Sequence, residues 1–518
     1  MSTEVDSATA NDSSDLAKFG YRQELERSLG SFSSFAAGFS YISIMTGVFE
    51  LFAFGFGSGG PAFIWTWPLV FIGQLAVAFC FAEVAGQFPI AGSVYQWSKQ
   101  IARPTTSWMA GWIMSIGAIV TAAAVAVAYQ VILPQISLAF QIVGGSADAG
   151  LTSTPNGAKN AILLALALVV FTTIINIIGV KVMSKINNFG VVVELTATVL
   201  LIIMLAVHIK RGPQQVLFDT NSTGAGHSWG YLGAFLVASL MSAYVFYGFD
   251  TAGALAEETR NPRRHAPRAI IRAITAAFIV GGLLMLVGMM AVGNLHASDL
   301  GTAGMPYLIK STLGTGLGDA FLVCSAIAIT VCCLAVQTAA IRMLFSMARD
   351  NRLPFSRQMG KVSKRAKTPA LPAIITGVLT IALLAVNIGN QRVFYILTSV
   401  AIILFYIPYL MVTGPMLLRR LRGNWPKPDH GQHFSLGRWG IVVNIFAVLY
   451  GAAMTVNLAW PRAAVYGSDH WYFQWGAVVF VVAIVVIGGV MLRVRRRAWA
   501  AASTAEHAAE PVVEGSAP

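Results

Sequence analysis

The chain has 518 residues, of which 56% are hydrophobic and 11% charged, and its mean hydropathy is +0.67. Soluble domains carry about 25% charged residues, so this composition excludes an ordinary soluble globular protein. A membrane-spanning helix needs about 20 apolar residues, and a chain of this length has room for roughly a dozen of them. The net charge of +13 would suggest a nucleic-acid partner in a soluble protein, but in a membrane protein it first indicates on which side of the bilayer each loop lies.

Apolar runs and the residues that interrupt them predict twelve membrane-spanning helices. In chain order these cover residues 33–57, 62–87, 107–140, 158–178, 188–209, 229–256, 267–294, 316–348, 369–389, 392–418, 437–459 and 471–492. The predicted fold class is an all-α polytopic membrane protein with twelve transmembrane helices. Residues 1–30 contain acids where a secretory signal peptide would be apolar, and they are expected to form a disordered tail, with a second tail at 493–518.

The basic residues fall almost entirely on one side of this topology. If the N-terminus is cytoplasmic, 29 of the 35 Lys and Arg residues lie in cytoplasmic segments. The six on the other side are Lys159, Lys210, Arg211, Lys310, Arg392 and Arg462. Because Lys and Arg collect in cytoplasmic loops, both termini are predicted to be cytoplasmic and the protein to lie in the cell membrane, plasma or inner. The positive charge then records orientation, and no nucleic-acid partner is expected.

Acids in the middle of predicted spans are the most informative polar groups, because burying each one in a bilayer costs free energy. Four occur, at Glu50, Glu83, Glu194 and Asp250, whereas no Lys or Arg lies near the middle of a span. An interior with acids and no bases favours cations, protons included. The four cysteines lie in apolar stretches without the spacing of a zinc site or a disulfide framework, so neither a metal ion nor a cofactor is expected.

Two predicted helices interrupt their own apolar pattern with small and polar residues. One carries FSYISIMTGVFE at 39–50 and the other SAYVFYGFDTAG at 242–253. They are the first helices of two five-helix blocks, 31–209 and 229–418, and 437–492 holds two further helices. Matched interruptions of this kind indicate the binding site of an inverted-repeat transporter, where unwound backbone faces a cavity. Close packing of helices through small residues is the structural alternative.

Three parts of the chain resemble the amino acid/polyamine/organocation (APC) permease superfamily. They are AEVAGQFPIAGSVYQW at 82–97, FYGFDTAGALAEETRNPRRHAPRAI at 246–270, and IRMLFSMARDNRLP at 341–354 followed by KTPALPA at 367–373. Within the superfamily, FSYISIMTGVF and GFDTAG are most similar to the amino acid/choline branch, which includes carriers of γ-aminobutyrate, choline and other amines. The resemblance covers about residues 31–493.

The resemblance implies a five-plus-five inverted repeat of the LeuT type followed by two C-terminal helices, with the substrate held between the unwound parts of the first and sixth helices. The substrate contacts that it implies are Ser43, Ile44, Met45, Thr46, Gly47, Tyr244, Tyr247, Gly248, Phe249 and Asp250. Met45 and Thr46 replace the first two residues of a Gly-Ser-Gly run that is usual in relatives, and Tyr244 falls where relatives often have a gating aromatic. Half-helix amino ends suit a carboxylate, and freed carbonyls and acids suit an ammonium group.

The resemblance also aligns Glu194 with a fifth-helix position where several relatives carry a lysine near a sodium site. A carboxylate there could carry the coupling proton or bind a cation, or could be a structural acid that is hydrogen-bonded to neighbouring helices. Glu50, one turn beyond Thr46, either faces the outer vestibule and attracts amines or pairs with a nearby polar group. Glu83 is expected to brace the loop that contains Lys99.

Two further acids follow the sixth helix. Glu257 and Glu258 are expected to form solvated surface pairs with Arg260, Arg263 or Arg264, which contribute little individually. A cytoplasmic salt-bridge gate is the alternative.

The predicted function is a secondary active transporter, or permease, for an amino acid or related amine, with alternating access and proton-coupled symport; sodium is the alternative coupling ion. The alternative carrier is a substrate/product exchanger for γ-aminobutyrate, choline or polyamines, or urea- and guanidine-type compounds. A non-transporting nutrient receptor or a channel forms a third class, and the short tails argue against the receptor. No enzyme activity is expected. The partners are the small-molecule substrate, the proton and the lipid bilayer, and the sequence leaves the oligomeric state open.

Overall fold

The computed structural model describes residues 16–509 apart from 226, 228, 364–365, 387, 389–392, 427–432, 463–464 and 466–470. Over this part of the chain the regular elements are helices, and Leu29 and Thr259 form one isolated parallel β-bridge. Ten helical segments of at least 18 residues are apolar enough to cross a membrane, and two apolar helices are shorter. A backbone in lipid must satisfy its own hydrogen bonds, which the helix does. The predicted all-α polytopic membrane fold is confirmed.

Each of the twelve predicted spans falls on one of these helical segments. The ten longer segments are α2 (Ser31–Ile42) with α3 (Ile44–Gly59), η1 (Pro61–Trp65) with α4 (Thr66–Gln87), α6 (Pro104–Val127) with α7 (Tyr129–Ile136), α8 (Pro155–Ile178), α9 (Val180–Val207), α13 (Pro262–Ala291), α15 (Thr315–Arg349), α18 (Val393–Leu421), η7 (Gly437–Trp439) with α19 (Gly440–Ala459), and the first part of α22 (Gly476–Ala509). The two shorter ones are α11 (Tyr231–Val245) and α17 (Ala370–Val386).

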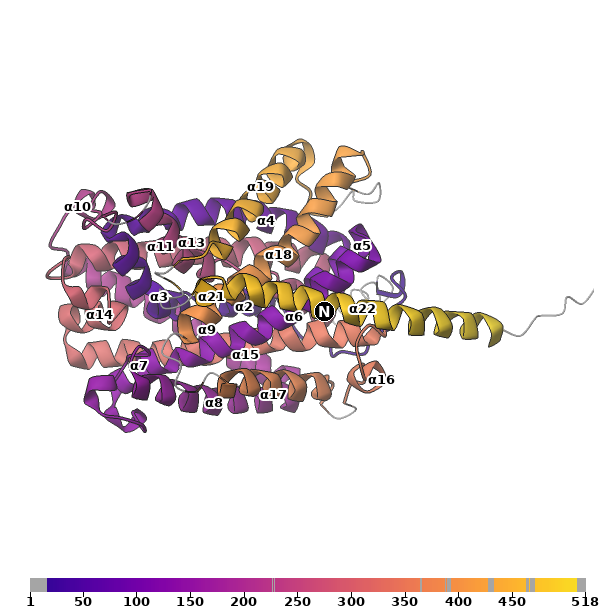
Figure 1. The fold of residues 1–518 in the computed structure, drawn as a ribbon, viewed down its shortest axis with the longest axis horizontal. Coiled ribbons are helices and arrows are strands. Elements are labelled where there is room, and N and C mark those ends of the chain that lie inside the picture. The colour runs from indigo at the N-terminus through magenta and orange to yellow at the C-terminus, as the bar shows by residue number, and fades with distance from the viewer. Residues whose placement is uncertain are drawn as a thin grey trace, which may run out of the picture.

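Short helices lie at the two ends of the bundle (Figure 1). α10 (Gln214–Leu217) and α14 (Gly304–Leu313) lie at one end, and α5 (Ser93–Ile101) and α16 (Ser356–Met359) lie at the other. The segments predicted to be cytoplasmic belong, where the structure describes them, to the end with α5 and α16, which include Lys99 and Arg357. We call this end the basic end and the other the opposite end.

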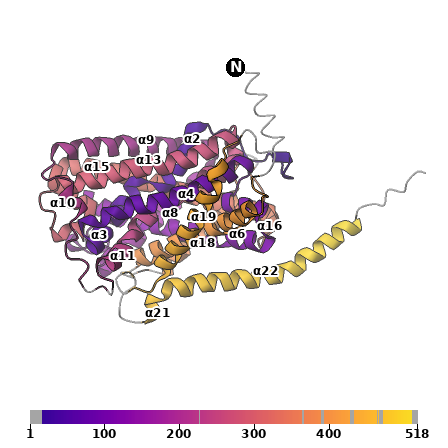
Figure 2. The same ribbon diagram turned by 90° about the horizontal axis from the view of Figure 1, so that it is seen from above.

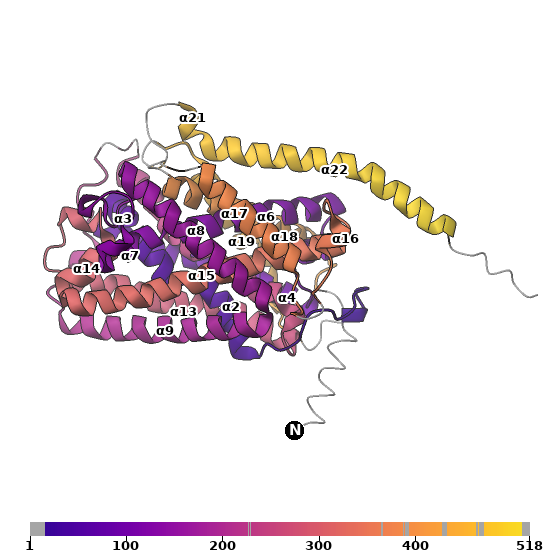
Figure 3. The same cartoon turned by 90° about the horizontal axis from the view of Figure 1, so that it is seen from below.

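The C-terminal helix α22 lies on the outside of the bundle and runs on past it at the basic end (Figures 2 and 3). It packs against α6 and α18. Its side chains Val482, Val486 and Val490 are each more than half exposed. A long helix in a membrane protein with an exposed apolar face is expected to contact lipid. Residues 493–509 of the expected second tail continue this helix, and 510–518 lie outside the described residues.

The interior of the bundle is built around two broken helices. α2 and α3 form one span that is interrupted at Ser43, and α11 is followed, after a non-helical stretch at 246–250, by the short helix α12 (Thr251–Ala254). α3 packs against α11 and α2 packs against α12, so the two interruptions lie side by side. Both occur where the sequence predicts them. The division into two five-helix blocks stays a prediction.

Residues 16–29, which we call the N-terminal arm, lie against the basic end. Tyr21 and Leu29 are buried. The Leu29 amide donates to the Glu258 carbonyl at 2.9 Å, and the Arg260 amide donates to the Leu29 carbonyl at 2.9 Å. The arm is therefore bonded to the segment between the sixth and seventh predicted spans. The first 15 residues of the expected disordered tail lie outside the described residues.

Candidate functional site

The first interruption opens the amino end of α3 inside the bundle. Ser43 has a φ of +32° and a ψ of 102°, which ends α2 and begins α3. Its amide donates to the Phe39 carbonyl at 2.8 Å, and its carbonyl accepts from the Gly47 amide at 3.0 Å. The amides of Ile44 and Met45 lie in the first turn of α3, where a helix leaves its N–H groups without carbonyl partners.

Glu194 of α9 occupies this amino end. Its Oε1 atom accepts hydrogen bonds from the Met45 amide and from the Ser43 hydroxyl, each at 2.9 Å. The Ser43 hydroxyl also lies 2.6 Å from Thr46 Oγ1, so its single proton serves one of the two acceptors at a time. The other carboxylate oxygen, Oε2, is buried and has no hydrogen bond of ordinary geometry, and the Ile44 amide also interacts with this carboxylate. Helix amino ends attract anions because their free N–H groups and dipole are positive.

A second buried carboxylate lies further along α3. Glu50 is 5% exposed, and neither of its carboxylate oxygens has a hydrogen bond of ordinary geometry. It interacts with the side chain of Tyr244 on α11 and with Cys332 on α15. Cys332 also interacts with Glu194 and donates to the Tyr41 carbonyl at 3.5 Å. Cys332 therefore links the surroundings of the two carboxylates.

The second interruption depends on Gly248. Its φ is +85°, and a Cβ atom at this position would lie 1.9 Å from Cδ1 of the Tyr41 ring. Only glycine fits a left-handed conformation against a packed ring. The Gly248 amide donates to the Tyr409 hydroxyl at 2.9 Å, which ties the interruption to α18.

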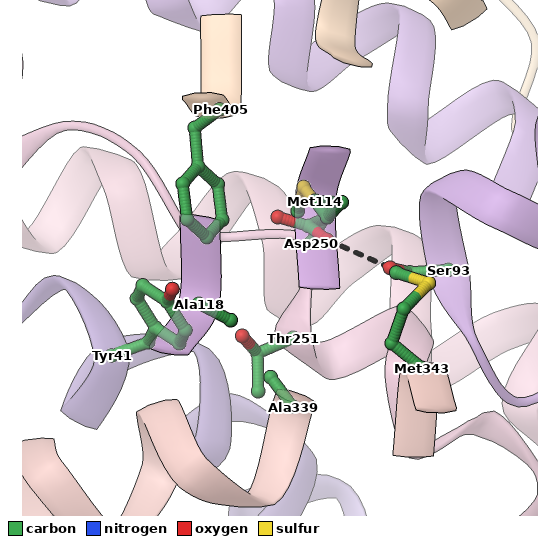
Figure 4. A pocket seen from close by; sticks show the side chains of 9 residues that line it. All are labelled: Tyr41, Ser93, Met114, Ala118, Asp250, Thr251, Ala339, Met343 and Phe405. Carbon is green, nitrogen blue, oxygen red and sulfur yellow. Dashed lines mark hydrogen bonds between the residues drawn. The ribbon is translucent and has the colours of Figure 1, made fainter. Parts of the chain in front are cut away.

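Asp250 follows Gly248 and is held by two hydroxyl groups. Its Oδ1 atom accepts from the Tyr409 hydroxyl at 2.6 Å, and its Oδ2 atom accepts from the Ser93 hydroxyl at 2.8 Å. Asp250 therefore joins the second interruption to α18 and to the start of α5. A small cavity lies against this carboxylate (Figure 4). It is lined by Tyr41, Ser93, Met114, Ala118, Asp250, Thr251, Ala339, Met343 and Phe405.

Aromatic rings from α2, α11, α18 and the second interruption pack against one another. The Tyr247 ring centroid lies 4.6 Å from that of Phe405 and 5.7 Å from that of Tyr244. The Tyr41 ring centroid lies 5.7 Å from that of Phe405. The Tyr247 hydroxyl is 3.1 Å from Thr121 Oγ1, so this ring also has a polar partner. The rings thus pack where the two broken helices meet.

Gly47 and Phe249 complete the predicted set, and both contribute packing. A Cβ atom at Gly47 would lie 2.6 Å from Val245 Cγ2, so glycine lets the two broken helices approach each other closely. Phe249 packs edge-on against Phe81, with ring centroids 5.8 Å apart. The roles of both residues as substrate contacts stay predictions.

The structure brings the predicted residues together in two groups. One gathers the first interruption with Glu194 and Glu50. The other gathers residues 247–250 with Ser93 and Tyr409, which the sequence analysis did not single out. Ser93 lies inside a segment that carries the family resemblance, and Tyr409 is a hydroxyl-bearing residue in an apolar span; these signals could have identified both.

Buried ion pairs join the helices at the basic end, with partners that differ from the expected ones. Glu257 and Glu258 are fully buried and pair with Arg349 at 2.7 Å and with Arg342 at 2.8 Å. The expectation of solvated pairs with the arginines of the following loop is therefore wrong. Both arginines lie in the C-terminal part of α15 (Thr315–Arg349), which packs beside the segment that contains the two acids.

Glu83 also has different partners from the expected ones. It accepts from Arg420 and from the Leu436 amide, the latter at 3.0 Å, and thus binds the segment that follows α18. Lys99 instead forms an ion pair with Asp350 at 2.6 Å. The expectation that Glu83 braces the loop containing Lys99 is wrong, because α4 presents this acid to the end of α18.

The interior offers carboxylates, hydroxyls and backbone amides for binding. Within the part of the chain that the structure describes, no group of three or more His, Cys, Asp and Glu side chains is placed to hold a metal ion. All four cysteines are free thiols.

Comparison with known proteins points to one family. A family model described as amino acid permease matches residues 29–492. Amino-acid permease BAT1 from Arabidopsis thaliana is 29% identical over 471 residues, which cover 86% of this chain and 88% of the relative. Amino-acid permease 2 from Neurospora crassa is 25% identical over 476 residues, which cover 89% and 84%. A putative amino acid/polyamine transporter from Macrophomina phaseolina is 25% identical over 433 residues, which cover 82% and 92%.

Proposed function

We propose that this chain, which belongs to the amino acid permease family, is a secondary transporter that moves an amino acid or a related amine across the cell membrane by alternating access. The observation that carries the proposal is the pair of broken helices that lie side by side inside a multi-pass membrane protein. Broken helices expose backbone groups that must face protein or a binding cavity at membrane depth, and in transporters they form the substrate site.

The substrate in this proposal binds between the two interruptions. Its contacts are Ser43, Ile44, Met45, Thr46 and Gly47 from the first interruption and Tyr244, Tyr247, Gly248, Phe249 and Asp250 from the second. Support comes from the amides and hydroxyls at the start of α3 and from the carboxylate of Asp250, which are the groups that a carboxylate and an ammonium group require.

The basic end faces the cytoplasm in this proposal, because Lys and Arg collect on that side of a membrane protein. The pairs Glu257–Arg349 and Glu258–Arg342 and the N-terminal arm all join elements across this end. Release of substrate toward the cytoplasm would require these contacts to separate. The ion pairs therefore belong to the closed state of the basic end.

We further propose that transport is coupled to a proton carried by Glu194. Support comes from the complete burial of this carboxylate and from its hydrogen bonds to Ser43 and Met45, which make its charge part of the geometry of the first interruption. An intramembrane acid at a helix interruption is a group whose protonation changes the local hydrogen bonding. Sodium is the alternative coupling ion.

Uptake of labelled amino acid by the purified protein in proteoliposomes tests the coupling. Glu194→Gln should abolish accumulation driven by a pH gradient and spare exchange of internal for external substrate, because glutamine keeps the size of the side chain but cannot carry a proton. Glu24→Gln, at an exposed position, is the matched control and should behave as the wild type. Unchanged gradient-driven accumulation in Glu194→Gln would exclude the proton-carrier role, and accumulation that follows a sodium gradient would assign the coupling to sodium.

A substrate/product exchanger that also accepts polyamines is the second candidate. The buried carboxylates of Glu50 and Asp250 favour cationic substrates, and one relative is named as a putative amino acid/polyamine transporter. Proteoliposomes loaded with unlabelled putrescine separate the two candidates. Uptake that requires internal putrescine and does not depend on the pH gradient would identify an exchanger.

A further inference from the structure

The amino end of α3 is an anion site that the protein fills with one of its own carboxylates. α3 is 16 residues long, and its first turn is buried in the bundle, where water does not screen its positive end. The Met45 amide and the Ser43 hydroxyl both reach Glu194 Oε1 at 2.9 Å, and the Ile44 amide also interacts with this carboxylate. Any other carboxylate that binds this helix end has to take over these same donors.

The second oxygen of Glu194 indicates how the site can change its occupant. Oε2 is buried and has no hydrogen bond of ordinary geometry. An ionised carboxylate with an unpartnered buried oxygen costs free energy, and a proton on Oε2 removes that cost. The same proton neutralises Glu194 and so weakens its attraction to the positive end of α3.

The ionisable groups near Glu194 do not supply a compensating positive charge. Cys332 of α15 interacts with Glu194 and also with Glu50 of α3, and it donates to the carbonyl of Tyr41 on α2. The described parts of α8, α13 and α14, which also pack against α9, place no charged side chain in contact with Glu194. The neighbours are therefore acidic or neutral, and a second anion would be repelled while Glu194 is ionised.

We propose that the amino end of α3 binds either the ionised carboxylate of Glu194 or the carboxylate of the substrate, so that a substrate carboxylate binds together with one proton on Glu194. Two ionised carboxylates cannot both bind the donors at the buried amino end of α3, because two negative charges that accept from the same donors repel each other strongly. The proton comes from water and binds Oε2, and Oε1 then releases the Met45 amide to the substrate. This inference rests on the proposed function and adds the substrate class: the coupled substrates are those with a carboxylate.

The first measurement needs no transported substrate. Glu194→Ala empties the amino end of α3, so sodium acetate, a small free carboxylate, should raise the melting temperature of this variant by several degrees. Acetamide, which is neutral, should not, and at about pH 8 the wild type should respond less than Glu194→Ala because acetate there has to displace the ionised carboxylate of Glu194. Glu50→Ala is the matched control, since it removes another buried acid, which belongs to α3 itself, but leaves the helix end occupied by Glu194. An equal acetate shift in the wild type or in Glu50→Ala would overturn the proposal.

The second measurement uses amino acids and the amines that lack only their carboxyl group. The pairs are alanine with ethylamine, leucine with isopentylamine, and lysine with cadaverine, whose amine and carboxyl groups keep their charges from about pH 5 to about pH 8, the range of the measurement. Affinity for the amino acids should fall as the pH rises, by up to about tenfold per pH unit, because the complex holds one more proton than the free protein. Affinity for the amines should not change. A pH dependence that is equal for the amines, or that survives in Glu194→Gln, would overturn the proposal.

The two measurements separate this proposal from the function on which it rests. If none of the three amino acids binds the wild-type protein, the proposed function fails for these substrates. The acetate response of Glu194→Ala still tests whether a carboxylate other than that of Glu194 can bind the amino end of α3. If Glu194→Ala does not fold, the comparison of Glu194→Gln with the wild type decides through the pH dependence.

Discussion

At the scale of single residues, Gly248 combines two constraints that no other side chain meets. Its φ of +85° is unfavourable for residues with a Cβ atom, and the Cβ atom would lie 1.9 Å from the Tyr41 ring. Gly248→Ala should therefore lower the free energy of unfolding by more than about 2 kcal/mol and abolish uptake. Gly414→Ala in α18 is the control, since its Cβ atom would meet nothing within 4 Å. Thermal unfolding of the purified variants checks this, and equal stability of the two would show that the second interruption tolerates a side chain.

The buried carboxylate of Glu83 ties α4 to the segment after α18. Arg420, its partner, is 6% exposed, so Glu83→Ala leaves a buried guanidinium without its counter-charge and should cost about 3–5 kcal/mol. The pair Lys181–Glu26 is the control, because Lys181 is 67% exposed and Lys181→Gln should cost less than about 1 kcal/mol. Unfolding in mixed micelles measures both. A loss in Glu83→Ala no larger than that in the control would mean that the buried pair contributes no net stability.

The buried acids of the membrane spans could be predicted from the sequence, but most of their hydrogen-bond and ion-pair partners could not. Glu83, Glu194 and Asp250 stand out because acids are rare in apolar spans. Arg420 lies 337 positions after Glu83 in the sequence, and spacing carries no information about contacts between helices so far apart. The same holds for Glu194, whose bonds to Ser43 depend on how α9 packs against α2 and α3.

At the scale of elements, the sequence predicts where apolar spans lie more accurately than where helices begin. The fifth span is predicted from residue 188, whereas α9 begins at Val180, because polar residues near a membrane surface can extend a helix without adding apolar character. The sixth span is predicted over 229–256, whereas α11 ends at Val245 and α12 contains four residues. Hydropathy is similar in helical and unwound segments, so the apolar pattern does not locate the end of α11 at Val245.

The N-terminal arm is an element that the apolar pattern did not indicate. The Tyr21 hydroxyl donates to Asp350 at 2.6 Å, and the Arg349 guanidinium lies 4.0 Å from the Tyr21 ring centroid. Burial, and next the Asp350 carboxylate, raise the pKa of Tyr21 above its ordinary value, so this hydroxyl stays protonated at neutral pH and remains a donor. The arm thus holds the end of α15 against the rest of the basic end.

Tyr21→Ala should loosen the arm and make the basic end open more often. The measurement is the rate at which a maleimide labels Ser93→Cys in a protein whose native cysteines are replaced by alanine, because Ser93 is 1% exposed and lies beside Asp250. Labelling should be several-fold faster with Tyr21→Ala than without it. Arg22→Ala, at an exposed neighbouring position, should leave the rate unchanged. Equal rates in the two variants would show that the arm does not restrain the basic end.

At the scale of the whole molecule, the twelve spans could be predicted because length and apolar character suffice to define a membrane crossing. The closure of the basic end could not, since it depends on pairs such as Glu258–Arg342, whose members are buried by the packing of distant segments. The distribution of charged residues between the two sides of the membrane predicts the orientation of the protein, but it does not predict which charged side chains form ion pairs. The Lys and Arg residues at the basic end therefore include both residues that predict orientation and residues that form buried ion pairs, such as Arg342.

The distribution of basic residues predicts which end of the protein faces the cytoplasm. The sequence places 29 of the 35 Lys and Arg residues on one side of the predicted topology, and the described part of these segments forms the basic end, so that end should face the cytoplasm because translocating so many positive charges is disfavoured. Single cysteines placed at exposed Arg22 of the arm and at Phe218, which is 74% exposed beside α10 at the opposite end, report the two sides in a background without native cysteines. In intact cells a membrane-impermeant maleimide should label Phe218→Cys and spare Arg22→Cys, and permeabilised cells should show both. Labelling of Arg22→Cys in intact cells would show that the basic end faces the outside.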